Sequence, residues 1–209
     1  MKKTKITPEE LDDQGSFRHL LTLSYDDLVP FILEYIGRRT WLTMAFWAFC
    51  LFLAGFAFVV RININGYYEI KRIILHSVLG FVVLPLLVVP LHELLHIIPY
   101  YLSGARDIRV GMDIRQYLFY VTAHRQVAGQ GLFRLVAAMP FTVITIAALF
   151  LAFLLPGLWK WSISAFLFIH TTMCAGDFAL LNFYLVNKGK KIFTWDDADL
   201  KEAYFFQEL

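Results

Sequence analysis

The dominant pattern in the chain is a series of four long apolar runs separated by short polar segments. The runs cover residues 41–60, 73–102, 135–155 and 161–187. Each is long enough for the roughly 20 residues that an α-helix needs to cross about 30 Å of hydrocarbon. A backbone inside lipid must satisfy its own hydrogen bonds, which favours helices over irregular chain. The pattern therefore predicts four transmembrane helices.

Shorter patterns occupy the polar segments. Residues 25–38 place apolar side chains at helical spacing, which predicts either an interfacial amphipathic helix or an ordinary helical linker before the first span. Residues 108–115 alternate strictly between apolar and non-apolar positions, which is typical of a β-strand, and residues 117–124 are suited to be its hairpin partner. The predicted fold class is an all-α membrane protein with about four transmembrane helices and a short β-hairpin insertion.

The basic residues predict how the chain is oriented. With four spans, the N-terminal segment 1–40, the insertion 103–131 and the C-terminal tail 188–209 share one side of the membrane domain 41–187. That side holds most of the lysines and arginines. The other side has only Arg61, Lys71, Arg72 and Lys160. Basic loops concentrate in the cytosol. We therefore expect a multi-pass cell-membrane protein with both termini and the hairpin in the cytosol.

Composition narrows the class of protein further. Hydrophobic residues make up 58% of the 209 residues and charged residues only 17%, which excludes a disordered chain and disfavours a plain soluble globule. The net charge of +2 is too balanced for a nucleic-acid binder. Cys50 and Cys174 both lie inside apolar runs, so no disulfide framework is expected. The expected partner is the lipid bilayer.

One motif carries candidate chemistry. His92, Glu93 and His96 form the pattern H-E-x-x-H within the second apolar run. Histidines four residues apart lie on one face of a helix and can share a metal ion, and zinc suits imidazole ligands. The glutamate beside the first histidine can act as general base and then as general acid in hydrolysis. Ionisable residues inside a span indicate function more often than structure, although a polar contact between helices is the simpler alternative.

A catalytic zinc ion usually takes a third protein ligand. The fourth run offers His170, Cys174 and Asp177 on one helical face. At 1.5 Å per residue, His96 and His92 lie about 9 and 15 Å from the cytosolic end of their run, and Asp177 about 17 Å from the end of its own. Cys174 and His170 lie deeper, at about 21 and 27 Å. Depth therefore favours Asp177 as the third ligand, with the other two as alternatives.

These residues carry a resemblance. A His-Glu-Leu-Leu-His motif at the cytosolic end of a span, a β-patterned loop, a further span and Gly176-Asp177 in the last span resemble the bacterial "putative zincin peptidase" family. That family is itself similar to the site-2 protease group of intramembrane metalloproteases. The resemblance covers roughly residues 70–185 and implies a zinc peptidase, with the insertion presenting an extended substrate. The order Gly-Asp departs from the Asp-Gly of the site-2 group, which weakens the ligand assignment of Asp177.

The sequence thus predicts a zinc-dependent intramembrane peptidase that hydrolyses a transmembrane protein substrate. Zn²⁺ would be held by His92, His96 and Asp177, with Glu93 as the catalytic acid–base residue. Two alternatives belong to other classes: a non-catalytic zinc-binding regulator or scaffold, and a small metal or solute transporter. Glu93 favours the enzyme, because a structural zinc site needs no acid beside its first ligand.

Overall fold

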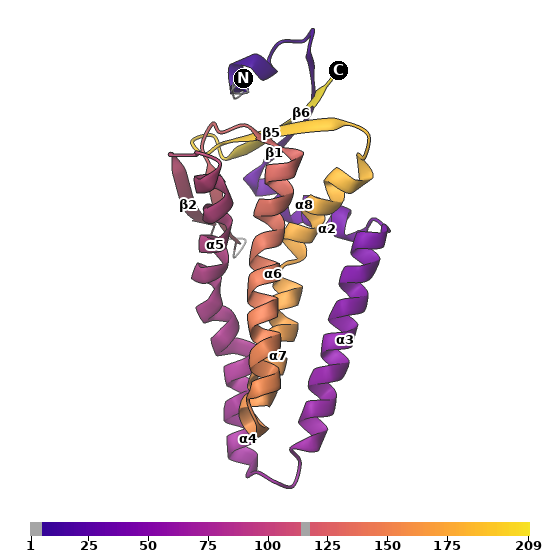
Figure 1. The fold of residues 1–209 in the computed structure, drawn as a ribbon, viewed down its shortest axis with the longest axis vertical. Coiled ribbons are helices and arrows are strands. Elements are labelled where there is room, and N and C mark those ends of the chain that lie inside the picture. Colours follow the sequence, from indigo (N-terminus) through magenta and orange to yellow (C-terminus); the bar gives the residue numbers. More distant parts are fainter. Residues whose placement is uncertain (1–5, 114–117) are drawn as a thin grey trace.

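The computed structural model describes residues 6–113 and 118–209. Three helices in this part of the chain are long and apolar enough to cross a membrane: Trp41–Asn63 (α3), the continuous helix Ile70–Leu102, and Gln130–Leu154 (α6). A fourth span exists if Gly157–Met173 (α7) and Ala175–Val186 (α8), which are bent by 42° at a short break, count as one. The four predicted helical runs are therefore present, the last as a bent pair (Figure 1).

The helix Ile70–Leu102 consists of three parts. Ile70–Val78 (α4) leads into a π-helical turn, Leu79–Val83 (η2), and then into Leu84–Leu102 (α5). The turn directly precedes Pro85, whose ring would clash with the carbonyl four residues earlier in a regular helix. Gly80 lies within this turn, and a Cβ atom there would overlap the carbonyl of Ser162 on α7. Close contact with α7 therefore requires glycine at this position.

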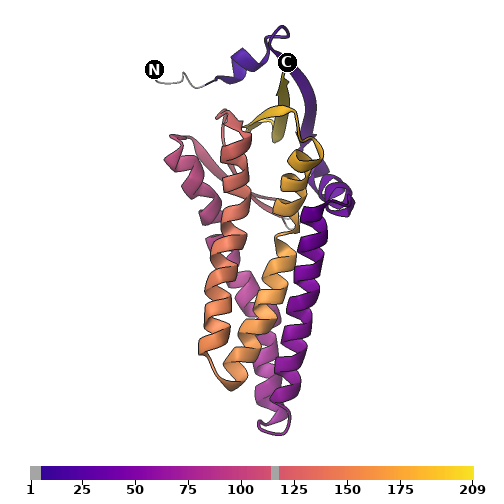
Figure 2. The same cartoon turned by 45° about the vertical axis from the view of Figure 1, so that its right-hand side comes forward.

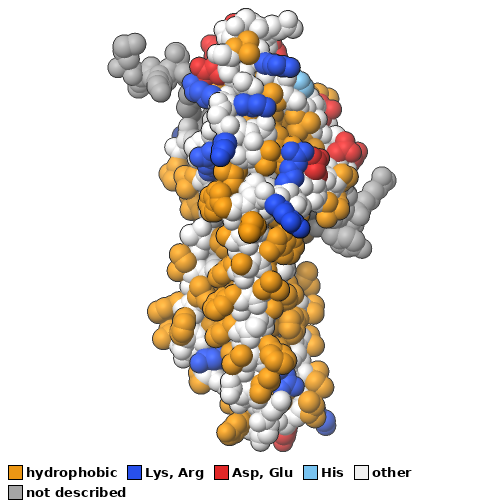
Figure 3. Space-filling view, turned by 90° about the vertical axis from the view of Figure 1, so that its right-hand side faces the viewer, with side chains coloured by type: hydrophobic (Ala, Val, Ile, Leu, Met, Phe, Trp, Pro, Cys, Tyr) orange, Lys and Arg blue, Asp and Glu red, His pale blue; other side chains and the backbone are white. Residues whose placement is uncertain are grey.

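Helix α7 is the central element of the bundle. Its residues 161–167 are all buried, and it packs against α3, α6, α4 and η2. Leu53, Ile144 and Leu167 belong to one apolar core between α3, α6 and α7. The outer faces of the helices expose large apolar side chains, and the flank of the bundle carries few charges (Figure 3). Such a surface is expected where lipid replaces water.

A four-stranded antiparallel sheet covers the end of the bundle where both termini lie (Figures 1 and 2). Its order is Phe17–Ser24 (β1), Glu202–Glu208 (β6), Lys191–Asp197 (β5) and Ala128–Gly129 (β4). The sequence analysis does not predict this sheet, so the class "all-α" is wrong: the fold is mostly helical with antiparallel strands. The prediction fails because β1 pairs with β6 from the opposite end of the chain, and a local pattern does not identify a partner that far away in the sequence.

The sheet and the bundle share one core. Leu23 and Phe205 from the sheet pack with Phe133 of α6 and Tyr184 of α8. The helix predicted within residues 25–38 is present as Leu28–Gly37 (α2), after a short 3-10 turn at Tyr25–Asp27 (η1). Helix α2 packs against α8. A single turn of helix, Pro8–Leu11 (α1), precedes β1. The segments predicted as separate N- and C-terminal regions thus meet in one cap.

The predicted β-hairpin is also present. Ile108–Asp113 (β2) pairs with Leu118–Ala123 (β3) in a separate two-stranded antiparallel sheet. Residues 114–117, where the predicted strands end and begin, lie outside the described residues. Gly111 pairs with Tyr120, and a Cβ atom at Gly111 would overlap the Tyr120 ring. Both strands contact α5, so the hairpin lies beside the helix that carries the histidine motif.

Candidate metal centre

The H-E-x-x-H motif lies on α5, as the sequence predicts. His92 and His96 are one turn apart on the same face, and their ring centroids are 5.0 Å apart. Their side chains are 14% and 12% exposed, so both are largely shielded. Glu93 is partly buried, and its carboxylate lies within 4.8 Å of a nitrogen atom of each histidine. The motif therefore presents two imidazoles and one carboxylate to a common region.

Asp177 faces both histidines from α8. Its Oδ2 lies 3.3 Å from His92 Nε2, and its Oδ1 lies 3.4 Å from His96 Nε2. The bend after α7 is what positions it, because Asp177 belongs to the first turn of α8 directly beyond the break. Its Oδ2 is buried and has no hydrogen-bond partner among the described residues. A buried carboxylate oxygen without a donor favours a nearby cation.

Each nitrogen–oxygen separation between Asp177 and a histidine has the length expected between two neighbouring ligand atoms of a zinc ion. Zinc–nitrogen and zinc–oxygen bonds of 2.0–2.2 Å place neighbouring ligand atoms about 3.3–3.5 Å apart at the corners of a tetrahedron. The two nitrogen–oxygen separations have this length. Each involves a different oxygen of the same carboxylate, so Asp177 offers one oxygen to each histidine. The donor set of two imidazoles and one carboxylate is also one that zinc accepts in catalytic sites.

A main-chain carbonyl orients one of the histidines. His96 Nδ1 lies 2.9 Å from the carbonyl oxygen of Val136 on α6. Since a carbonyl only accepts, Nδ1 carries a proton, and in the neutral ring Nε2, the nitrogen that faces Asp177, is then the one able to bind a metal. A histidine that binds metal through one nitrogen usually donates from the other in this way. The sequence analysis missed Val136, because a backbone acceptor has no side-chain signature.

His170 and Cys174 lie close to this group but on its far side. The His170 ring is 5.7 Å from the His92 ring, and His170 and Cys174 are fully buried. Cys174 Sγ contacts the carbonyl oxygen of His170 at 3.3 Å and His170 Nε2 at 3.8 Å. Ligand atoms of His92, His170 and Cys174 lie within 4.8 Å of one another. This alternative set reaches only one residue of the motif, whereas Asp177 contacts both histidines.

Asn182 lies on α8, the helix of Asp177, and forms hydrogen bonds to neighbouring segments. It is fully buried, and its Nδ2 donates to the carbonyl oxygens of Tyr35 at 2.7 Å and Arg38 at 3.1 Å. Its Oδ1 accepts from Thr40 Oγ1 at 2.6 Å. All of its hydrogen-bonding capacity joins α8 to the corner between α2 and α3. Asn182 therefore acts as a hydrogen-bonded contact between helices.

A second group of histidine and aspartate lies in the cap. His124, Asp197 and Asp199 place ligand atoms within 4.8 Å of one another. His124 Nδ1 accepts from the backbone N–H of Ala198 at 3.1 Å, and Arg109 Nη1 donates to Asp199 at 2.6 Å. The His124 side chain is only 11% exposed, because it packs between the hairpin and β5.

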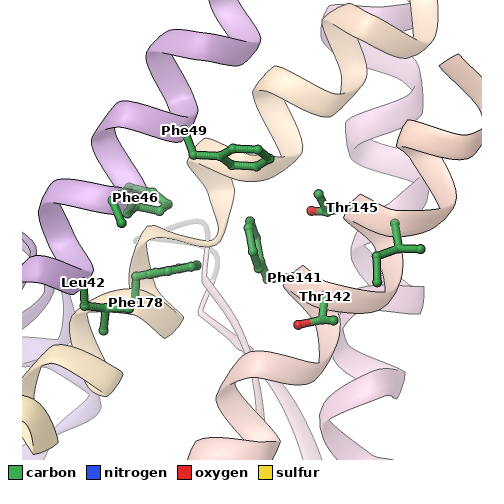
Figure 4. Close-up of a pocket in the computed structure, with 9 residues that line it drawn as sticks. Leu42, Phe46, Phe49, Phe141, Thr142, Thr145 and Phe178 are labelled. Atoms are coloured by element: carbon green, nitrogen blue, oxygen red, sulfur yellow. The ribbon is translucent and has the colours of Figure 1, made fainter. Parts of the chain in front are cut away.

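An apolar pocket of about 310 Å³ opens between α3, α6 and α8. Phe46 and Phe49 from α3 converge there with Phe141 from α6 and Phe178 from α8 (Figure 4). Phe178 directly follows Asp177, so the pocket adjoins the helix turn that carries the carboxylate. Thr145 lines the pocket, and its buried hydroxyl has no hydrogen-bond partner in the described part of the chain.

Comparison with known proteins identifies the family. A family model described as "Putative zincin peptidase" matches residues 85–193, which is just over half of the chain and includes the motif and Asp177. No curated protein and no solved structure matches the chain. The chain thus shares with this family the segment that builds the histidine–aspartate centre, and it belongs to the zincin peptidase family so described.

Proposed function

We propose that this protein is a zinc-dependent peptidase that cleaves membrane-embedded protein segments. The observation that carries the proposal is the convergence of His92 Nε2 and His96 Nε2 on the two oxygens of Asp177, at 3.3 and 3.4 Å. These three residues are the proposed ligands. The histidines lie in a helix long and apolar enough to span a membrane, and Asp177 lies in the bent pair of helices α7 and α8, which reaches that length as one unit. Zincin family membership supports zinc as the metal.

Each protein group has a separate role in the proposed reaction. When bound, zinc supplies Lewis-acid chemistry that favours hydrolysis at neutral pH. Glu93 accepts a proton from the water molecule as the water oxygen attacks the carbonyl carbon of the scissile peptide. Glu93 then donates this proton to the amide nitrogen as the carbon–nitrogen bond breaks. The products are a carboxylic acid and an amine, and the carboxylate of Glu93 is regenerated.

The apolar pocket supports a substrate that enters from the bilayer. Its lining of phenylalanines from three helices suits an apolar segment better than a soluble peptide. It adjoins α8 at Phe178, next to the proposed ligand Asp177. A transmembrane substrate must unwind locally before cleavage, because a helical backbone keeps its carbonyls in hydrogen bonds. The pocket is proposed to receive the apolar part of that substrate.

The hairpin supports binding of the unwound part. Strand β2 has one strand neighbour, β3, in the described part of the chain. Its outer edge therefore offers backbone donors and acceptors to an extended segment. The hairpin contacts α5, so a strand added there lies beside the helix of the motif. Addition of a strand is the proposed way of presenting the scissile bond.

The same proposal includes the topology of the chain. Both termini, the four-stranded sheet and the hairpin lie at one end of the bundle (Figure 1). We assign this end to the cytosol, on the evidence of its basic residues. Residues 41–187 then form the membrane domain with the insertion 103–131. Residues 1–40 and 188–209 together form the cytosolic cap.

The test compares wild-type protein with Glu93→Gln in cells. Glu93→Gln should keep zinc and lose peptidase activity by at least about 100-fold, because the isosteric amide cannot carry the proton. Glu69→Gln, at an exposed position before α4, is the matched control and should behave as wild type. Proteomics of membrane-protein fragments measures the peptidase activity, and metal analysis of the purified proteins measures the zinc content. Identical fragment patterns in wild type and Glu93→Gln would reject the peptidase and leave a zinc-binding regulator.

A further inference from the structure

A proline lies in the middle of α6, close to the metal centre. Pro140 is fully buried within the helix Gln130–Leu154. Proline has no backbone N–H, so it cannot donate to the carbonyl four residues before it. In α6 that carbonyl belongs to Val136, which is itself buried. A buried carbonyl without a donor is unfavourable, most of all in a membrane-spanning segment where water is absent.

The missing donor comes from the motif helix. His96 Nδ1 lies 2.9 Å from the Val136 oxygen. The histidine therefore takes the place that the N–H of residue 140 would occupy in an uninterrupted helix. The bond fixes the proton on Nδ1 and leaves the Nε2 lone pair directed at Asp177, 3.4 Å away. A single residue of α6, Pro140, is thus linked to the orientation of the His96 imidazole on α5.

We propose that Pro140 is a positioning residue for the metal centre, because its missing N–H keeps the Val136 carbonyl free for His96. The inference rests on the proposed function, since it assumes that His96 binds metal through Nε2. The bond explains why a helix-breaking residue lies in the centre of α6.

Other prolines in the bundle lack this feature. Pro90 and Pro99 also lie inside a helix, α5. The carbonyls four residues before them belong to Leu86 and Leu95. No side chain among the described residues donates a hydrogen bond to either carbonyl. Among these three prolines, only Pro140 leaves a carbonyl that pairs with a histidine of the motif. Pro90 is exposed and offers a matched control.

The experiment measures zinc affinity and thermal stability of the full-length protein in detergent micelles. Pro140→Ala and Pro140→Val both restore the N–H, and they differ in side-chain volume. Zinc affinity, measured by competition with a chelator, should fall by about 10- to 100-fold in both, which is typical when the partner of a metal-binding histidine is lost. The melting temperature of the metal-free protein should stay equal or rise, because α6 regains a hydrogen bond. Pro90→Ala should keep the zinc affinity within about twofold.

The possible outcomes separate the inference from the proposed function. If wild type binds no zinc, the metal centre itself is rejected, and the inference is rejected with it. If wild type binds zinc and both Pro140 variants bind equally tightly, only the inference is rejected. A loss of zinc affinity that accompanies a lower melting temperature would assign Pro140 a packing role instead. A loss in the alanine variant alone would point to side-chain volume and likewise overturn the proposal.

Discussion

The molecule contains two groups of histidine and aspartate that look alike in composition and differ in their hydrogen bonds. In the bundle, His92 and His96 direct Nε2 atoms at Asp177, whose buried Oδ2 has no donor in the described part of the chain. In the cap, His124 Nδ1 already accepts from a backbone N–H. Asp197 Oδ1 accepts from the backbone N–H groups of residues 199 and 200.

The two groups differ in their unfilled acceptors rather than in their residue types. The cap group is satisfied by the protein itself, and Arg109 supplies the positive charge beside Asp199. In the bundle group the Nε2 atoms of both histidines face the two oxygens of Asp177, and Asp177 Oδ2 has no hydrogen-bond partner among the described residues. Buried polar atoms are nearly always paired in folded proteins. The unpaired group is therefore the one suited to an added cation.

The largest expected difference between the two groups is in zinc content. His92→Ala combined with His96→Ala should reduce zinc from about one per chain to nearly none, because a single remaining ligand does not retain zinc against a chelator. His124→Ala should leave the zinc content unchanged. Metal analysis of the purified proteins at matched expression measures both. Zinc that persists in the double variant, or disappears with His124, would reverse the assignment of the two clusters.

A smaller difference is expected for the aspartates. Asp177→Asn keeps the shape and removes the charge, so zinc affinity should fall on the order of 100- to 1000-fold. Asp197→Asn should not affect zinc and should cost at most about 1 kcal/mol, because the amide oxygen can still accept from the backbone. His170→Ala and Cys174→Ala should change zinc affinity far less than Asp177→Asn. Normal zinc binding by Asp177→Asn, with loss in His170→Ala, would move the third ligand to His170.

The smallest expected effect concerns pH and the cap. Burial raises the pKa of Asp196 to about 6 from the usual 3.8, although the nearby Thr122 hydroxyl lowers it. Between these values the folded state binds the proton more tightly than the unfolded state, so the stability of the folded state falls as pH rises from about 4 to 6. Asp196→Asn should remove this loss and stabilise the protein at pH 7 by about 1–2 kcal/mol.

Unfolding measured between pH 4 and 7 tests the prediction for Asp196. Asp199→Asn is the matched control, because this aspartate is exposed and its ion pair with Arg109 contributes little. The control should keep the pH dependence of wild type. A slope that is the same in Asp196→Asn and in wild type would show that Asp196 is ionised in the folded state without cost.

The local sequence determined a large part of this protein. Long apolar runs fixed the helices, because a span needs only hydrophobic residues in sufficient number. The four-residue spacing of His92 and His96 placed both on one face of α5, since helical geometry is set by the chain itself. Strict alternation over residues 108–113 gave the strand β2 for a similar reason. Counting residues from the end of each run also predicted that Asp177 lies level with His92, and these two side chains are 3.3 Å apart in the structure.

Other features depended on contacts between distant segments. The strands β5 and β6 are rich in aromatic and β-branched residues, which is a signal for strands, but their partner β1 lies near the other end of the chain. The bend between α7 and α8 brings Asp177 to the histidines. The carbonyl of Val136 on α6 contacts His96 on the neighbouring helix α5.

Only the tertiary structure decided which polar groups remained without partners. His92, His96 and Asp177 in the bundle and His124, Asp197 and Asp199 in the cap have similar residue types, and either set could be proposed from composition. A residue's type states what it can donate or accept, but its neighbours in space determine whether that capacity is already used. Backbone groups of α6 and of the cap form these hydrogen bonds. Every residue has the same backbone groups, so the sequence does not indicate which of them will be used. The residue types of the proposed metal centre are therefore set by the local sequence, and the acceptors left without partners around them are set by the tertiary structure.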